Sequence, residues 1–163
     1  MGSSYAGGWL GGPTRLTGRP DLAPATHRAA IGGCIDKDWP GAQAWEGARL
    51  SLHRAVPGRA QGLVLGLMDV TAEAEAEFTD WYETEHMPRL AAVAGVLVAA
   101  RYRALAGHSP AYLALYQLED VAISQSAQWL EAARTPWSAR MRRFVSNYRR
   151  YSFARSHDES GDD

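Results

Sequence analysis

The sequence predicts an α+β domain in which two helices pack on one face of a four-stranded antiparallel sheet. Three observations support this prediction. The 163 residues are enough for one domain of ordinary size. Apolar segments of strand length alternate with helical segments in the order strand, helix, strand, strand, helix, strand. Strong turn residues separate the two middle strands. This order is the ferredoxin-like βαββαβ arrangement, and we place it in residues 62–155.

Residues 1–61 differ in composition from the rest of the chain. They hold 11 of the 16 glycines and 5 of the 8 prolines, and they show no sustained period of two or of 3.6. Such a segment buries too little apolar surface to offset the entropy of ordering it. We expect a mostly disordered extension with at most a short helical turn around residues 42–52. Read-through upstream of the true start codon is an open alternative.

The regular pattern begins with the apolar run 62–70, which has the length of a strand. Thr71 suits a helix N-cap, and Glu73 lies in the first turn, where the helix dipole favours a carboxylate. The aromatic residues that follow have helical spacing. Pro88 disfavours helical geometry at the preceding residue, so we expect the first helix to end near His86.

The remaining elements follow from the same signals. Thr135 is expected to cap the last helical turn, with Pro136 at its first position. The expected elements are a strand at 96–105, a turn at 106–110, a strand at 111–118, a helix at 123–134, a helical turn to residue 144, a strand at 147–153 and a frayed acidic tail at 156–163.

This arrangement leaves one face of an apolar sheet without helices. A sheet this apolar cannot expose a whole face to water, so we expect a homodimer in which two sheets bury their bare faces against each other.

Composition excludes several classes of partner. A formal net charge of -1 gives no electrostatic reason to expect nucleic acid. No apolar run approaches the ~20 residues of a membrane span, and the N-terminus lacks the pattern of a secretion signal. Cys34 is the only cysteine, which fits a reducing compartment. We therefore expect a cytoplasmic protein without nucleic acid or membrane partners.

Several motifs carry a resemblance to a known family. They are Trp81-Tyr82-x-x-Glu85-His86-x-Pro88, then Val93-x-Gly95-Val96 with Arg101-Tyr102, and later Thr135-Pro136-Trp137-x-x-Arg140. Together they resemble the dimeric α/β-barrel superfamily, in particular its EthD-like small proteins. Ala94 departs from the usual pattern, which has proline there. The resemblance covers 62–155 and implies a homodimer with a small-molecule pocket between sheet and helices in each subunit.

His86 is the candidate catalytic residue. It falls at the edge of the buried helix face, where a side chain can reach both core and ligand. Near a helix C-terminus and beside Glu83 and Glu85, it should hold its proton more tightly than a free imidazole. That predicts a general acid or an acid/base shuttle. Tyr82 could donate a hydrogen bond to the same ligand, although an aromatic residue on a buried face is more often part of the core.

Further candidates lie on the strands. Arg101 and Arg103 share one strand face, and Arg101 could bind a substrate carboxylate or phenolate; pairing with acidic residues is the more ordinary role. Tyr112 and Tyr116 also share a face and could form pocket walls.

No metal or cofactor is expected, because the histidines and acidic residues do not form a ligand set. The first hypothesis is a small cofactor-free isomerase, dehydratase, cyclase or decarboxylase acting on an aromatic or polyketide-like small molecule. The alternatives are a non-catalytic dimer that binds a small molecule or has a structural role, and a haem-associated protein with His86 as axial ligand.

Overall fold

A computed structural model describes residues 45–155 and the backbone of three short N-terminal segments, 8–11, 14–17 and 28–31. These three segments are strands β1 (Gly8–Gly11), β2 (Thr14–Thr17) and β3 (Arg28–Ile31). With the strands of residues 45–155 they form one eight-stranded antiparallel sheet in the order β2-β1-β8-β5-β7-β6-β4-β3. The five long strands are β4 (Trp45–Ala55), β5 (Gly62–Val70), β6 (Val96–Ala104), β7 (Tyr112–Leu118) and β8 (Val145–Arg155).

The four strands expected from the sequence are present as β5 to β8, and the middle two form the expected hairpin. The expected total of four is too low. Strand β4 adds a fifth long strand beside β6, and three four-residue strands extend the two edges of the sheet. The ferredoxin-like core is therefore part of an α+β fold whose sheet is wider than four strands.

The structure of residues 45–55 differs from the prediction for this part of the chain. They form strand β4 rather than the short helical turn expected around residues 42–52, and they lie in the segment expected to be mostly disordered. Burial alternates along the first half of the strand, from buried Trp45 to exposed Glu46 and buried Gly47. Backbone bonds to β6, interrupted by two register shifts, hold the strand in place. These contacts join segments distant in sequence, so composition alone gave no sign of them.

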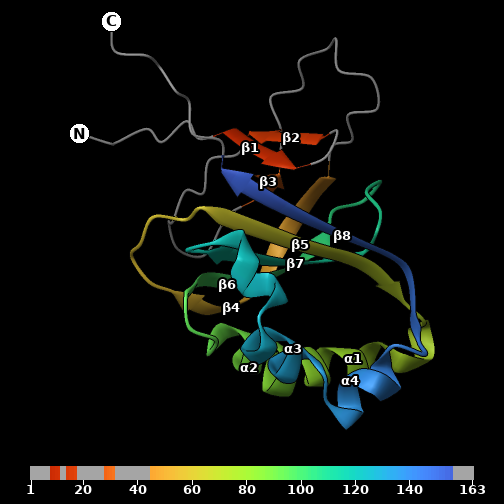
Figure 1. The fold of residues 1–163 in the computed structure, drawn as a ribbon. Coiled ribbons are helices and arrows are strands. Elements are labelled where there is room, and N and C mark those ends of the chain that lie inside the picture. The colour runs from red at the N-terminus through yellow and green to blue at the C-terminus, as the bar shows by residue number, and fades with distance from the viewer. Residues whose placement is uncertain (1–7, 12–13, 18–27, 32–44, 156–163) are drawn as a thin grey trace, which may run out of the picture.

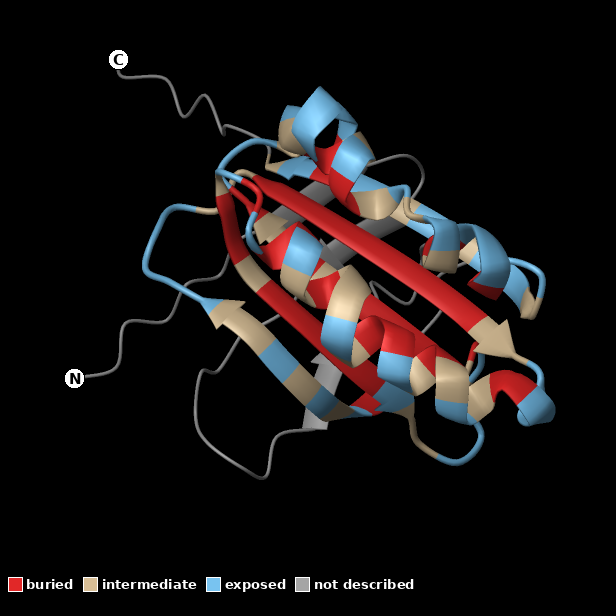
Figure 2. Ribbon diagram, turned by 90° about the horizontal axis from the view of Figure 1, so that it is seen from below, coloured by how far each residue is buried: buried red, intermediate tan, exposed pale blue. Residues whose placement is uncertain are grey.

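The helices cover one face of the sheet (Figure 1). The first helical segment comprises a 3₁₀ turn (Ala72–Ala74), α1 (Glu75–Trp81), a π-helical turn (Tyr82–His86) and α2 (Met87–Ala91). The second comprises a 3₁₀ turn (Val121–Gln125), α3 (Ala127–Ala133) and α4 (Pro136–Met141). Buried residues line the sides of these elements that face the sheet, while their outer sides are exposed (Figure 2).

The first helix does not end at His86, as the sequence predicted, but continues to Ala91 with Pro88 inside it. The π turn explains this continuation: the amide of Met87 bonds to the carbonyl of Tyr82, five residues back. Because the α-helical pattern is already widened there, a proline one residue later adds little disruption. Thr135 caps α4 as expected, accepting a hydrogen bond from the amide of Ser138 at 2.9 Å.

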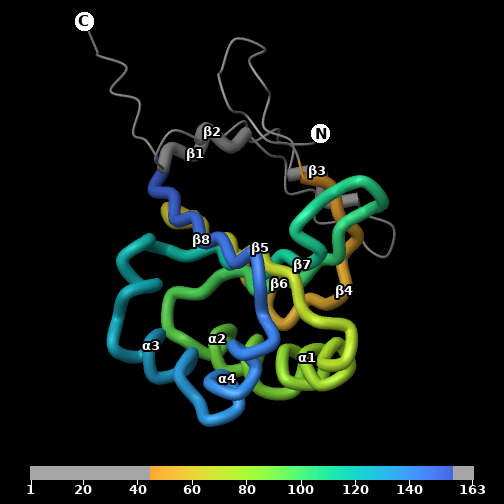
Figure 3. Tube along the Cα trace, turned by 90° about the vertical axis from the view of Figure 1, so that its right-hand side faces the viewer, coloured from red at the N-terminus to blue at the C-terminus, as the bar shows by residue number. Residues whose placement is uncertain are grey.

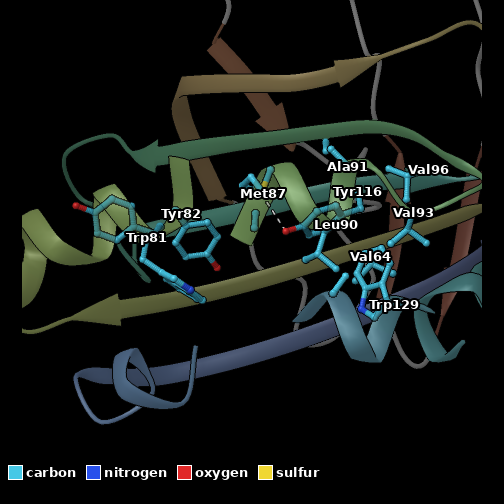
Figure 4. Packing of buried hydrophobic residues seen from close by; sticks show 14 of the residues in the cluster. Val64, Trp81, Tyr82, Met87, Leu90, Ala91, Val93, Val96, Tyr116 and Trp129 are labelled. Atoms are coloured by element: carbon cyan, nitrogen blue, oxygen red, sulfur yellow. Dashed lines mark hydrogen bonds between the residues drawn. The ribbon is translucent and has the colours of Figure 1, made fainter. Parts of the chain in front are cut away.

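The core between sheet and helices is filled by apolar and aromatic side chains, and we call it the inner core. Phe78, Met87, Val96, Leu118 and Met141 within it are completely buried. Figure 4 shows side chains from the helices meeting side chains from β5, β6 and β7. The trace in Figure 3 shows the same two layers from the side.

A second apolar cluster lies on the sheet face that points away from the helices, and we call it the outer face. Its buried residues are Trp45, Leu63, Leu65, Leu67, Ala100, Tyr102, Leu113 and Phe153. The sequence analysis expected this face to be bare in a single subunit. In the structure it is covered: only 1% of Phe153 and none of Leu113 is exposed.

Three N-terminal strands lie beyond the long strands. β1 (Gly8–Gly11) pairs with β8 and with β2 (Thr14–Thr17), and β3 (Arg28–Ile31) pairs with β4. Figure 1 shows all three on the side of the sheet opposite to the helices. The N-terminal segment thus reaches both edges of the long-stranded sheet.

Candidate functional site

The π-helical turn Tyr82–His86 brings His86 against Trp81. In a regular α-helix, residues five apart point roughly 140° away from each other. The wider turn brings them onto the same side, and here the two ring centres lie 4.4 Å apart. The Tyr82 ring meets the His86 ring edge-on at 5.1 Å. Single π turns of this kind are frequent at functional sites.

The environment of His86 lowers its pKa, contrary to the sequence prediction. Burial, with a further contribution from the positive charge of Arg142, lowers the pKa from 6.5 to about 4. The prediction failed because it assumed a helix end at His86, whereas the helix continues to Ala91, and the half-buried ring is largely desolvated with its Nδ1 atom inside the protein. The imidazole is therefore neutral near pH 7 and can accept a proton but not donate one as a cation.

Two ring nitrogens in this region make no hydrogen bond to any residue that the structure describes. The Nε1 atom of Trp81 and the Nδ1 atom of His86 are both buried, and neither has a hydrogen-bond partner among the described residues. Buried polar groups without partners are uncommon and costly, at about 1–3 kcal/mol each. Such a pair of adjacent polar groups is suited to a ligand oxygen or to a buried water molecule.

Tyr82 and Tyr116 lie in the inner core, with their hydroxyl groups directed at sulfur atoms. The Tyr82 hydroxyl donates to Sδ of Met68 at 3.2 Å, and the Tyr116 hydroxyl donates to Sδ of Met87 at 2.9 Å. Burial raises the pKa of both tyrosines far above the ordinary value, so both are neutral. Thioether sulfur is a weak acceptor, and methionine is the most adaptable core residue. Figure 4 shows Tyr116 directed at Met87.

Arg101 is buried in an aromatic cage. Only 1% of the residue is exposed, and the rings of Phe78, Tyr82 and Tyr112 surround its guanidinium carbon at 5.1, 4.7 and 4.9 Å. Its Nη1 donates to Oε1 of Glu83 at 3.1 Å, while its buried Nε has no partner among the described residues. Arg101 is thus paired with an acidic side chain, the more ordinary role considered from the sequence.

Glu83 links Arg101 to strand β4. Its carboxylate accepts from Ser51 Oγ at 2.9 Å and lies 2.8 Å from Nε2 of His53. Burial raises the pKa of this carboxyl, but Ser51, His53 and Arg101 together lower it below the ordinary value. Sequence reasoning placed His53 in the disordered segment and missed this contact. The alternation of Ser51 and His53 on one side of a strand was the available signal.

Arg103 and Tyr112 meet at a separate, more exposed point. The Tyr112 hydroxyl donates to Glu75 Oε1, and Arg103 Nη1 donates to the Tyr112 oxygen at 2.6 Å and to the same carboxylate. Burial and the bond to Glu75 raise the pKa of Tyr112 to about 12. These three side chains border a shallow surface hollow with Thr79 and Asp80.

The structure therefore connects most of the candidate residues. Tyr82 touches both His86 and Arg101, and Arg101 also touches Tyr112. Tyr116 instead packs edge-on against Trp129, with ring centres 5.0 Å apart. Among the described residues, no three His, Cys, Asp or Glu side chains cluster closely enough to hold a metal ion. No helix in the same part of the chain has the length and apolar character needed to cross a membrane.

No protein-family model and no curated protein matches the sequence. Solved structures do resemble the fold. A candidate monooxygenase of Fusobacterium nucleatum superposes with a TM-score of 0.52 at 9% identity, covering 69% of this chain and 52% of that one. This chain therefore spans about half the length of that protein.

Two Listeria monocytogenes proteins are similar as well. The haem-degrading enzyme LmHde gives a TM-score of 0.51 at 11% identity, covering 68% of this chain and 71% of that one. A ferredoxin-fold protein related to antibiotic biosynthesis monooxygenases gives 0.50 at 9% identity, covering 72% and 68%. At these identities the likeness shows the fold alone, which is ferredoxin-like and of the kind found in antibiotic biosynthesis monooxygenase-like proteins.

Proposed function

We propose that this chain is an EthD-like small enzyme that binds an aromatic or polyketide-like molecule between its helices and its sheet, without a bound cofactor. Isomerisation, dehydration, cyclisation and decarboxylation are the reactions that need only placed proton transfer in a dry site. The observation that carries the proposal is the pair of buried ring nitrogens on Trp81 and His86, which have no hydrogen-bond partner in the part of the chain that the structure describes. The fold shared with the candidate monooxygenases and the haem-degrading enzyme agrees with a small-molecule role.

His86 is assigned the role of proton acceptor. Its depressed pKa keeps the imidazole in the neutral form that a proton acceptor requires at neutral pH. The Trp81 indole N–H is a donor only, and it can hold a substrate oxygen beside the imidazole. The sequence predicted a general acid or an acid/base shuttle at His86. The proposal is instead a base paired with a hydrogen-bond donor.

Ligand entry requires the inner core to open, and its methionines are the side chains that can give way. Met68 and Met87 each receive a tyrosine hydroxyl that would bond more strongly to a ligand oxygen. Tyr82 and Tyr116 are therefore proposed as substrate-binding residues. When a ligand binds, each hydroxyl group would donate its hydrogen bond to a ligand oxygen instead of to the methionine sulfur. Arg101 and Tyr112 remain proposed binding residues; Arg101 becomes available to an anion if its bond to Glu83 opens.

Haem does not fit the residues present. The inner core fills the space between helices and sheet, and the Nδ1 atom of His86 is enclosed beside Trp81 and Tyr82. A macrocycle would have to displace this whole aromatic group. Haem titration of the purified protein should therefore give no Soret band that depends on His86, and a band lost in His86→Asn would overturn this conclusion.

The proposal can be tested with 1-hydroxy-2-naphthoate as an aromatic acid and 1-naphthol as its uncharged counterpart. The indole N–H resonance of Trp81, assigned with Trp81→Phe, should shift on titration with one of these probes in the wild type. His108→Asn is the matched control, because His108 lies in a distant loop near Glu46. The control should keep the shift, and His86→Asn should weaken it.

Chemistry is tested separately from binding. Incubation with a binding probe and mass analysis of the products should show a reaction that His86→Asn abolishes and His108→Asn keeps. Binding without any turnover would favour the alternative, a non-catalytic small-molecule-binding protein. Absence of any Trp81 shift with either probe class would contradict the proposed site.

A further inference from the structure

The outer face is an apolar surface that one sheet layer cannot bury by itself. Side chains on strands stand roughly perpendicular to the sheet, and a second layer about 10 Å away is needed to exclude water from them. The helices all lie on the other face (Figure 1). Nevertheless Leu65, Leu113 and Phe153 are 4%, 0% and 1% exposed in the single chain. Something in the same chain therefore covers them.

The paired strands indicate which part of the chain does so. β1 joins the β8 edge through Trp9 opposite Arg155 and Leu10 opposite Ala154. β3 joins the opposite edge, with Ala30 facing Glu46 on β4. The described N-terminal strands therefore lie at both edges of the long-stranded sheet, and the helices occupy one of its faces. Figure 1 shows β1, β2 and β3 on the outer side.

We infer that the N-terminal strands β1–β3 cover the outer face of their own sheet and take the place that a second subunit would occupy. The homodimer predicted from a bare sheet face then competes with this intramolecular cover. Two copies can pair through the outer face only where the cover has left it. This inference is independent of His86 and of any ligand.

The test uses the full chain and measures oligomeric state and side-chain accessibility together. Sedimentation identifies a concentration at which the wild type is a single subunit, and carbene footprinting is done there. Tyr102 and Phe153 report on the outer face, and both are buried in the structure. Tyr148, which is 58% exposed, and Tyr116, which is buried in the inner core, are the internal controls. Tyr102 and Phe153 should be labelled at least ~5-fold less than Tyr148, as Tyr116 is.

Leu10→Pro removes the cover. β1 has neighbours on both sides, so a proline inside it breaks a ladder bond to β2 or to β8. Labelling of Tyr102 and Phe153 should rise several-fold, or the variant should become a dimer that protects them again. Labelling of Tyr116 should stay low, which shows that the rest of the fold is intact.

A cross-linked variant keeps the inference falsifiable if Leu10→Pro does not fold. In a Cys34→Ser background, Leu10→Cys with Ala154→Cys places two cysteines opposite each other on β1 and β8. Oxidation should form the disulfide within one chain, and the oxidised protein should stay monomeric with Tyr102 and Phe153 protected.

Three results would overturn the inference. The first is strong labelling of Tyr102 and Phe153 in the monomeric wild type. The second is a wild type that protects them only as a dimer, because the second copy would then be the occupant. The third is a pair of cysteines at positions 10 and 154 that links different chains or does not link at all.

Discussion

The guanidinium carbon of Arg101 lies 4.7 Å from the centre of the Tyr82 ring, while its Nη1 donates a hydrogen bond to Glu83, the next residue of the same π-helical turn. The buried cation of Arg101, on strand β6, thus packs against the π-helical turn. Because the guanidinium is enclosed by three aromatic rings and one carboxylate, it links the inner core to the Ser51 and His53 side chains of β4 through Glu83.

Arg101→Met should destabilise the protein by about 2–4 kcal/mol, because it removes one member of a buried ion pair and leaves Glu83 with fewer donors. Arg103→Met is the matched control. The Arg103 side chain is 53% exposed, so its pair with Glu75 is screened by water, and its loss should cost less than ~1 kcal/mol. Urea unfolding of both variants measures the difference. Equal losses would contradict the assigned burial of Arg101.

The desolvation of the half-buried His86 ring should make stability depend on pH. Its pKa is about 4 in the folded protein and near 6.5 when unfolded, so below pH 6.5 the unfolded state binds the proton more readily. Lowering the pH from 7 to 5 should cost about 2 kcal/mol through this group, and the loss should be complete below pH 4. His86→Gln should remove that part of the pH dependence. An unchanged difference between pH 7 and pH 5 would show that the His86 ring is not desolvated.

Alanine substitutions at Gly95 and Gly107 should distinguish the cost of backbone strain from the cost of a steric clash. Both have positive φ, 82° and 88°, which side chains other than glycine rarely adopt. A Cβ at Gly107 meets nothing within 4 Å, so Gly107→Ala should cost only the strain of about 1 kcal/mol. A Cβ at Gly95 would lie 2.3 Å from Cδ1 of Ile123, so Gly95→Ala should cost about 1–2 kcal/mol more. Thermal unfolding tests the order, and equal costs would mean that Ile123 moves aside freely.

Tyr112 should control the ionisation of Glu75. The Tyr112 hydroxyl, followed by Arg103, lowers the pKa of the Glu75 carboxyl. Tyr112→Phe should therefore raise that pKa and cost about 1 kcal/mol of stability. Tyr116→Phe removes a hydroxyl directed at Met87 instead, and it should leave Glu75 unchanged. An NMR titration of the Glu75 carboxyl distinguishes the two variants. A Glu75 pKa that is the same in Tyr112→Phe as in the wild type would contradict the contact.

The sequence by itself determined most of the local elements of residues 62–155, although it placed the end of the first helix at His86 rather than Ala91. Strand β5 matches its expected range, and Thr135 caps α4 as expected by accepting a hydrogen bond from the amide of Ser138. Thr71, the other expected cap, lies at the N-cap position, but its side chain accepts no capping hydrogen bond among the described residues. These features depend on periodicity and on contacts within a few residues, which a single sequence displays. The same reasoning placed Arg101 and Arg103 on one strand face and Tyr112 and Tyr116 on one face of the next.

Tertiary structure alone decided what surrounds those side chains. The pKa of His86 shifts in the direction opposite to the prediction, because desolvation by the surrounding structure is its main cause, whereas the prediction considered only neighbouring carboxylates and an expected helix end. The partners Ser51 and His53 reach Glu83 from a strand 30 and more residues away that composition identified as disordered. The cover on the outer face is likewise set by pairings between the first and last parts of the chain. The spacing of residues along the chain determines which side chains share a face of a strand or helix. The solvent exposure and the ionisation of those side chains depend on the elements that pack against that face.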